Sequence, residues 1–269
     1  MQGRPQSPMV SRLHGKVALV TGGASGLGQA IAQRLSDEGA SVIISDIQAE
    51  LGQASASSGG FAFLQQDVCD EQQWHEIVGK SEERYGRLDV LVNNAGILGS
   101  MASVSPENTS LEDWRRIFAV NVEGVFLGCR SAIAAMRRAG GGSIVNLSSI
   151  GALQATPFAT AYGASKAAVR QLSQSIARHC AEARMNIRCN SVHPGVILTP
   201  LWLKMADELA SARGITTGQL IDEERAAIPM GDFTRAEDIA AAVAFLASED
   251  ARHVTGAALV VDGGIIHCK

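Results

Sequence analysis

A glycine-rich segment near the start of the chain has the residue types and spacing that bind phosphate. Segment 21–28, TGGASGLG, follows a short apolar run and leads into residues of helical periodicity. Gly22, Gly26 and Gly28 let the backbone take positive φ angles and approach a pyrophosphate closely, with N–H groups of the following helix pointing at it. Glycines also serve tight turns and helix packing, but their place between a strand and a helix favours a nucleotide site.

Asp46 stands where an acidic residue can select the nucleotide. It ends the second apolar run, 18 residues after Gly28, so its carboxylate can accept hydrogen bonds from the hydroxyls of an adenosine ribose. A 2′-phosphate would bring about two negative charges against this carboxylate, and no Arg or Lys occurs at 23–25 or 45–50 to neutralise them. The sequence therefore predicts NAD and not NADP, although Asp46 can also be the N-cap of the next helix.

Four polar side chains further along are candidates for catalysis. Tyr162 and Lys166 are four residues apart, which places both on one face of a helix and within reach of one target. That spacing alone is frequent and usually belongs to a solvated helix face. Ser149 lies thirteen residues before Tyr162, just past a predicted strand and at the same sheet edge as the glycine-rich segment. Asn121 is a poor helix former among apolar neighbours, so it needs a polar partner if it is buried.

The elements that position these residues form a regular alternation. Short apolar runs rich in Val and Ile alternate with segments of helical period, which predicts an α/β doubly wound fold with a seven-stranded parallel sheet and helices on both faces. The runs are continuously apolar, as expected for strands buried on both faces. We expect strands at 17–21, 41–45, 61–65, 88–92, 143–147, 186–191 and 257–261, and helices at roughly 26–38, 48–56, 70–85, 111–139, 158–182 and 235–247.

The alternation breaks only at 199–230, an irregular stretch that we interpret as an insertion at the carboxyl edge of the sheet, where open α/β folds bind ligands. No linker rich in Pro, Gly and Ser divides the chain, so we expect one domain over 15–269 after a flexible extension at 1–14.

The composition limits the possible partners and location. Of the 269 residues, 46% are hydrophobic and 19% are charged, which excludes disorder throughout. The 23 basic and 27 acidic residues give a net charge of −4, so no basic field is present to attract nucleic acid or an anionic membrane. With no apolar signal region and no stretch that approaches a membrane span, we expect a cytoplasmic protein. The five cysteines are scattered without a C-x-x-C pair, so we expect free, buried thiols and no metal site.

Together these motifs resemble the short-chain dehydrogenase/reductase family in its single-domain form. The resemblance rests on segment 21–28, N-N-A-G at 93–96, the four candidate side chains, and Pro194-Gly195 after the sixth predicted strand. It spans about residues 15–265, and the order and mutual spacing of the motifs make coincidence improbable. The family's members have a Rossmann fold and transfer a hydride between a nicotinamide cofactor and a carbinol carbon.

The resemblance implies a role for each catalytic candidate. Tyr162 would be the general base in oxidation and the general acid in reduction. Lowering its phenol pKa from about 10 to about 7 requires roughly 4 kcal/mol of phenolate stabilisation, which Lys166 and the positive nicotinamide can largely supply. Lys166 would also bind the nicotinamide ribose, and Asn121 would hold a water that links Lys166 to solvent. Ser149, favoured over Ser148 by its thirteen-residue interval to the tyrosine, would bind the substrate oxygen.

The resemblance also implies the cofactor contacts. Residues 94–96 would lie beside the adenosine ribose, and Ile197 and Thr199 would contact the nicotinamide. Asp67 would contact the adenine, or cap the helix that begins near Asp70. We interpret His193 as structural. The expected cofactor-binding residues are Gly22, Ser25, Gly26, Leu27, Gly28, Asp46, Ile47, Asp67, Val68, Asn94, Ala95, Gly96, Tyr162, Lys166, Pro194, Gly195, Ile197 and Thr199.

The insertion at 199–230 would form a lid over the substrate. It carries only Lys204, Arg213 and Arg225 against five acidic residues, which disfavours phosphorylated substrates such as coenzyme A thioesters. The segments 93–98 and 125–136 are similar to those of bacterial hydroxysteroid and alicyclic alcohol dehydrogenases. The expected substrate pocket comprises Ser149, Gln154, Tyr162, Leu201, Trp202 and Met205, with Leu98, Met101 and Phe158 as further apolar candidates.

We therefore expect an NAD-dependent oxidoreductase that interconverts a steroidal or alicyclic secondary alcohol and its ketone. A 3-oxoacyl thioester reductase and a non-catalytic NAD-binding protein are the alternatives. The predicted helices 111–139 and 158–182 are rich in alanine, including Ala132, Ala134, Ala135, Ala167 and Ala168. Their small faces permit close packing on the sheet or on another subunit, and the family resemblance favours a homotetramer.

Overall fold

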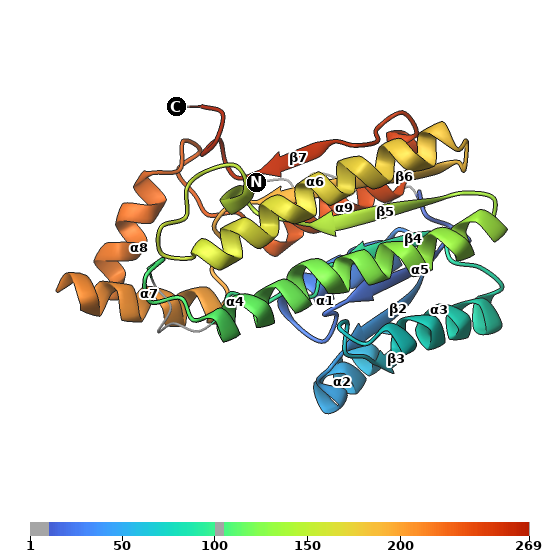
Figure 1. The fold of residues 1–269 in the computed structure, drawn as a ribbon, viewed down its shortest axis with the longest axis horizontal. Helices are drawn as coiled ribbons and strands as arrows, with labels where there is room; N and C mark the ends of the chain where they lie inside the picture. The colour runs from blue at the N-terminus through green and yellow to red at the C-terminus, as the bar shows by residue number, and fades with distance from the viewer. Residues whose placement is uncertain (1–10, 100–104, 269) are drawn as a thin grey trace, which may run out of the picture.

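The computed structural model describes residues 11–99 and 105–268, and within them seven strands form one parallel sheet in the order β3-β2-β1-β4-β5-β6-β7 (Figure 1). All neighbouring strands are parallel, which confirms the doubly wound α/β fold. The strand order reverses between β1 and β4, and open sheets of this kind bind ligands at that point. The strands are β1 Val17–Thr21, β2 Ser41–Asp46, β3 Ala62–Gln65, β4 Val90–Asn93, β5 Gly142–Leu147, β6 Ile187–Pro194 and β7 Ala258–Val261.

Helices cover both faces of the sheet. On one face, α1 and α9 pack over the core through Ile31, Leu35 and Val243. On the other face, α3, α5 and α6 pack through residues such as Trp74 and Val169, and Figure 1 shows α5 and α6 lying side by side across the sheet. The helices are α1 Gly26–Asp37, α2 Ala49–Gly59, α3 Glu71–Tyr85, α4 Leu111–Phe118, α5 Gly124–Arg138, α6 Thr160–Glu182, α7 Pro200–Arg213, α8 Thr217–Ala226 and α9 Ala236–Ala247.

The single helix expected at 111–139 is interrupted. A π-helical turn, Ala119–Glu123, lies between α4 and α5 and contains Asn121. By length and composition the continuous run Leu111–Arg138 could cross a membrane, contrary to the expectation from the sequence. Half of its apolar window is buried within the protein, however, and α5 packs on α3 and β4. This run is therefore a core helix of the fold.

The insertion after β6 consists mainly of two helices, α7 and α8. Thr199 caps α7 by accepting a hydrogen bond from the Trp202 N–H, and Pro200 occupies the first turn. Thr216 and Gln219 form a capping box that starts α8. Both helices pack on each other through a small apolar cluster and extend beyond one end of the sheet (Figure 1).

Three further expectations need correction. Residues 11–14, assigned to a flexible extension, are attached to the domain: Leu13 is fully buried in the core and Arg12 pairs with Glu38. Cys69 is exposed because it lies in the turn before α3, and Cys268 is exposed near the end of the chain, so only the other three thiols are buried. Strand β6 extends to Pro194, three residues further than predicted, because β7 pairs with that end.

Candidate active site

Helix α6 places Tyr162 and Lys166 at the carboxyl edge of the sheet. Lys166 is buried, and its Nζ donates a hydrogen bond of 2.9 Å to the carbonyl of Leu147, the last residue of β5. The same Nζ lies 5.6 Å from the centre of the Tyr162 ring. Burial lowers the pKa of Lys166 from 10.5 to about 8, because the ammonium loses the solvation of water. A group with that pKa remains mostly protonated at neutral pH.

Ser149 is the serine that meets Tyr162. It begins the short turn Ile150–Ala152 after β5, where its Oγ accepts a hydrogen bond of 3.0 Å from Gly151 N. Burial raises the pKa of the Tyr162 hydroxyl, and the side-chain hydrogen bond with Ser149 opposes that rise. Ser148 has a structural role instead. Its Oγ donates a hydrogen bond of 2.8 Å to the Lys166 carbonyl, which connects α6 to the residue after β5.

Asn121 finds the polar partners that its burial requires. Its Oδ1 accepts from Ile97 N at 2.8 Å, and its Nδ2 donates to Ile97 O at 2.9 Å and to Ser165 Oγ at 3.0 Å. Both amide hydrogens are therefore used within the protein, and the side chain fixes the segment that follows β4. A Cβ on Gly96 would lie 3.3 Å from both Asn121 Oδ1 and Lys166 Nζ, so a glycine keeps this corner of the site open.

The glycine-rich turn has the shape of a phosphate cradle. Gly22 and Gly26 have φ angles of +64° and +53°, which are strained for other residues. A Cβ on Gly28 would collide with the Gly22 carbonyl oxygen, whereas one on Gly26 would project into open space. The Ser25 side chain caps none of the first N–H groups of α1 within the described chain. These groups fit the diphosphate of a dinucleotide.

Residues after β4 hold this turn in place. Asn94 Nδ2 donates to the carbonyls of Thr21 and Gly22 at 2.9 and 3.2 Å. Thr21 Oγ1 accepts in return from Asn94 N and Ala95 N, at 3.0 and 3.1 Å. The structure therefore brings segment 94–96 against the turn, as the expected cofactor contacts require.

Asp46 is bound to the same turn. Its Oδ2 accepts from Ala24 N at 3.2 Å and its Oδ1 accepts from Gln48 N at 3.0 Å. Gln48 is the N-cap of α2, so the alternative in which Asp46 caps that helix is wrong.

The capping alternative for Asp67 is wrong as well, because Asp70 caps α3 through Gln72 N and Gln73 N. Asp67 instead accepts a hydrogen bond of 2.9 Å from Cys69 N and stays in the loop after β3. Val68 beside it is buried, and Ile47 after β2 is 62% exposed.

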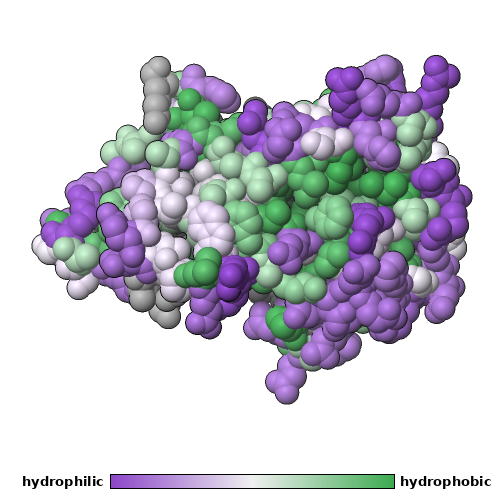
Figure 2. Space-filling model, viewed as in Figure 1, coloured by the Kyte–Doolittle hydropathy of each residue, from purple (hydrophilic) through white to green (hydrophobic). Residues whose placement is uncertain are grey.

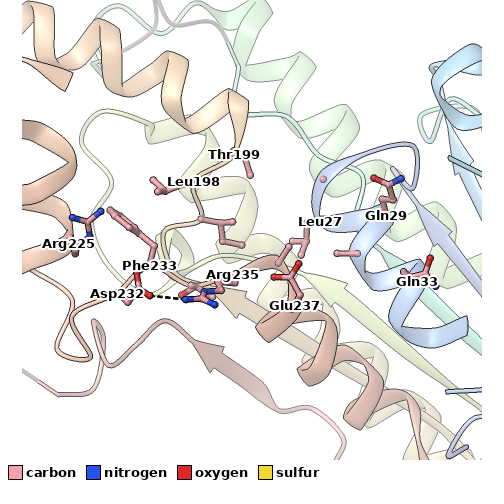
Figure 3. Close-up of a pocket in the computed structure, with 15 residues that line it drawn as sticks. Leu27, Gln29, Gln33, Leu198, Thr199, Arg225, Asp232, Phe233, Arg235 and Glu237 are labelled. Atoms are coloured by element: carbon pink, nitrogen blue, oxygen red, sulfur yellow. Dashed lines mark hydrogen bonds and ion pairs between the residues drawn. The ribbon is translucent and has the colours of Figure 1, made fainter. Parts of the chain in front are cut away.

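A cavity of about 630 Å³ lies between the start of α1 and the segment after β6 (Figure 3). Gly26, Leu27, Ile197 and Thr199, all expected cofactor contacts, line it. Sequence reasoning did not find the opposite wall, because no motif marks its residues. That wall includes Arg225 of α8, Phe233 and Arg235.

The expected substrate residues are only partly brought together. Ser149 and Tyr162 are in contact, and Trp202 is half-buried with its ring centre 5.9 Å from that of Phe233. Gln154 is exposed and Met205 is half-buried on α7. The side chain of Leu201 and residue Met101 lie outside the described part of the structure.

Comparison with known proteins agrees with this geometry. A family model described as enoyl-(acyl carrier protein) reductase matches residues 22–266. The chain is 42% identical to the NADP-dependent (R)-specific alcohol dehydrogenase of Lentilactobacillus kefiri and 45% identical to the cyclopentanol dehydrogenase of Comamonas testosteroni, in each case over 95% of this chain and 98% of the relative. It is 38% identical to the 3-beta-hydroxysteroid dehydrogenase of Comamonas testosteroni, over 96% of this chain and 98% of the relative.

Among solved structures, levodione reductase matches with a TM-score of 0.86 and 33% identity, over 94% of this chain and 98% of that one. The chain belongs to the short-chain dehydrogenase/reductase family. It is an oxidoreductase that acts on alcohols with a nicotinamide cofactor.

Proposed function

We propose that the protein is an NAD-dependent dehydrogenase of steroidal or alicyclic secondary alcohols, with Tyr162 as general acid and base. The observation that carries this proposal is the grouping around Tyr162 at the sheet edge where the glycine-rich turn lies: Ser149 is its side-chain hydrogen-bond partner, and Lys166 Nζ lies 5.6 Å from its ring centre. A non-catalytic nucleotide-binding protein has no need of a buried ammonium 5.6 Å from the centre of a tyrosine ring.

Ser149, Tyr162 and Lys166 have different roles in the proposed reaction. A nicotinamide bound at the glycine-rich turn would supply the hydride acceptor for the alcohol carbon, and in reduction the hydride donor for the ketone. Ser149 holds the substrate oxygen next to the Tyr162 hydroxyl, which takes the alcohol proton in oxidation and gives it back in reduction. Because burial raises the pKa of Tyr162, the phenolate requires a nearby positive charge. Lys166, mostly protonated at neutral pH, supplies it at 5.6 Å from the ring centre.

The negative charge of Asp46 supports NAD as the cofactor. The Asp46 carboxylate accepts a hydrogen bond from the glycine-rich turn, and residues 23–25 and 45–50 contain no Lys or Arg. The 2′-phosphate of NADP would therefore meet a negative charge with no basic side chain from these segments. The Lentilactobacillus relative is NADP-dependent by name, so a direct assay of both cofactors decides this point.

The names of the relatives support the substrate class. One relative is a cyclopentanol dehydrogenase and another acts on a 3-beta-hydroxysteroid. Phe233 lines the cavity, and the ring of Trp202, which belongs to the insertion, lies beside it with the ring centres 5.9 Å apart; aromatic side chains suit an apolar ring better than a charged carrier. The family model is described by an acyl-carrier substrate, and a 3-oxoacyl thioester is therefore the competing substrate to include.

Turnover of cyclic secondary alcohols by the wild type and by Tyr162→Phe tests the proposal. General acid and base catalysis is worth about 100- to 10,000-fold, and we expect kcat to fall by that factor. The chain has only two tyrosines, and Tyr85→Phe on α3 is the matched control, expected to keep wild-type turnover. Unchanged turnover in Tyr162→Phe contradicts the mechanism, and turnover of 3-oxoacyl thioesters alone contradicts the substrate class.

We also propose a homotetramer formed through α5 and α6. Ala132 and Ala135 are fully buried against the sheet, whereas Ala134 and Ala167 are exposed on the outer face, and Phe126 is 45% exposed. Figure 2 shows apolar side chains gathered over this pair of helices. Analytical ultracentrifugation measures the assembly, and a monomer at micromolar concentration contradicts it.

A further inference from the structure

The side chain of His193 extends the pairing of β5 and β6 beyond the last backbone hydrogen bond. Ser148 N donates to Val192 O at 2.8 Å, and one residue further along the carbonyl oxygen of Ser149 accepts from Ala152 N at 3.0 Å, within the turn Ile150–Ala152. His193 Nδ1 lies 2.9 Å from this carbonyl oxygen. The imidazole is completely buried, so no water competes for the bond.

The hydrogen-bond partners determine which ring nitrogen carries the proton. A carbonyl oxygen can only accept, so Nδ1 of His193 must donate to Ser149 O. Nε2 lies 2.9 Å from Ser191 Oγ, and in the neutral ring it accepts the hydroxyl hydrogen. Burial lowers the pKa of His193, and the charges of Arg170 and Lys166 lower it further, whereas the bond to Ser149 raises it. The ring is therefore neutral, with its hydrogen on Nδ1.

The Ser149 carbonyl therefore has two partners, Ala152 N from its own turn and His193 Nδ1 from β6, and the bond from His193 ties the residue that meets Tyr162 to the sheet. Ser149 has an extended backbone, with φ −168° and ψ 160°, and its Oγ also accepts from Gly151 N. Its carbonyl and its side chain belong to one residue, so fixing the peptide plane limits where Oγ can lie. His193 also directly precedes Pro194 and Gly195, which lead to the cavity-lining residues Ile197 and Thr199.

We propose that His193 is a positioning residue for the reaction: its Nδ1–H holds the Ser149 main chain so that the Ser149 hydroxyl faces Tyr162. This inference rests on the proposed function, because it gives Ser149 a part in binding the substrate oxygen. It changes the interpretation of His193 from a general structural residue to one that acts through Ser149.

Two amide substitutions separate the two ring nitrogens. In His193→Asn the amide can place an N–H where Nδ1 lies, whereas in His193→Gln the amide reaches the position of Nε2. Both variants keep a polar, uncharged side chain in the same buried space. Because a displacement of about 1 Å in a catalytic group reduces rates by about 100-fold, we expect kcat of His193→Gln to fall about 10- to 100-fold. We expect His193→Asn to stay within about threefold of wild type.

A second pair of measurements shows whether the effect passes through Ser149. In a Ser149→Ala background, His193→Gln is expected to change kcat by less than about twofold, because the group that it positions is gone. Equal losses in the Asn and Gln variants, or the full additional loss in the Ser149→Ala background, overturn the proposal. Failure of the proposed function is distinguishable, since Tyr162→Phe would then retain wild-type turnover.

Discussion

The buried ammonium of Lys166 has a measurable effect on stability as well as on chemistry. Its pKa is about 8 in the folded protein and 10.5 when the side chain is in water. The unfolded chain therefore holds this proton more tightly, and a protonated Lys166 destabilises the folded state. The difference corresponds to about 3 kcal/mol at pH values below 8. The side chain is only 4% exposed, so little solvent screening reduces this figure.

The penalty disappears as the pH rises through the interval from about 8 to 10.5, because there the unfolded state binds more protons than the folded state. Between pH 7 and pH 9.5 the recovery amounts to about 2 kcal/mol of the free energy of unfolding. Lys166→Met removes the titrating group and also the bond to Leu147 O. The loss of this bond changes the free energy of unfolding of the variant by an amount that is the same at every pH.

We therefore expect the stability of wild type relative to Lys166→Met to rise by about 2 kcal/mol from pH 7 to pH 9.5. Urea denaturation of both proteins without cofactor measures this difference. The range stops below pH 10 because Tyr162, whose pKa is raised by burial, begins to act in the opposite direction there. Lys80→Met, at an exposed position on α3, is the control. Its free energy of unfolding should change with pH in the same way as that of the wild type. If the free energies of unfolding of Lys166→Met and wild type change equally with pH, the reasoning is refuted.

Two further predictions concern the cofactor. Asp46→Ser removes the carboxylate that we propose to face the adenosine ribose, so the ratio of kcat/KM for NADP to that for NAD should rise about 10- to 100-fold, each tenfold step being about 1.4 kcal/mol. An unchanged ratio in steady-state assays argues against selection by this charge. In Gly28→Ala the new methyl group collides with the Gly22 carbonyl oxygen, so we expect a loss of about 1–3 kcal/mol of stability. Weaker NAD binding should accompany that loss, and wild-type values in urea denaturation and in cofactor titration would show that the turn tolerates a Cβ.

Local signals predicted most of the fold. The continuous apolar runs form strands whose ends lie no more than three residues from the expected ones, because both faces of the sheet are buried by helices. Some local signals have two uses, and the sequence left both open. An aspartate after a strand can cap a helix or stay free of the cap, and for Asp46 and Asp67 the structure excludes the capping alternative, since both accept hydrogen bonds from loop N–H groups. The π-turn around Asn121 has no sequence signal of its own.

The sequence by itself determined the family, the order of the motifs and the class of cofactor. These depend on two local features: backbone conformations that few residues other than glycine tolerate, and the spacing of residues along a single helix or strand. Gly22 and Gly26, with their positive φ angles, and the pair Tyr162 and Lys166 on one helix are of this kind. Only the tertiary structure decided which groups meet across the sheet. His193 contacts Ser149 over a separation of 44 residues, and Lys166 finds the Leu147 carbonyl across 19. Such contacts, and the burial that lowers the pKa of Lys166, arise from packing between elements, and no local pattern encodes them.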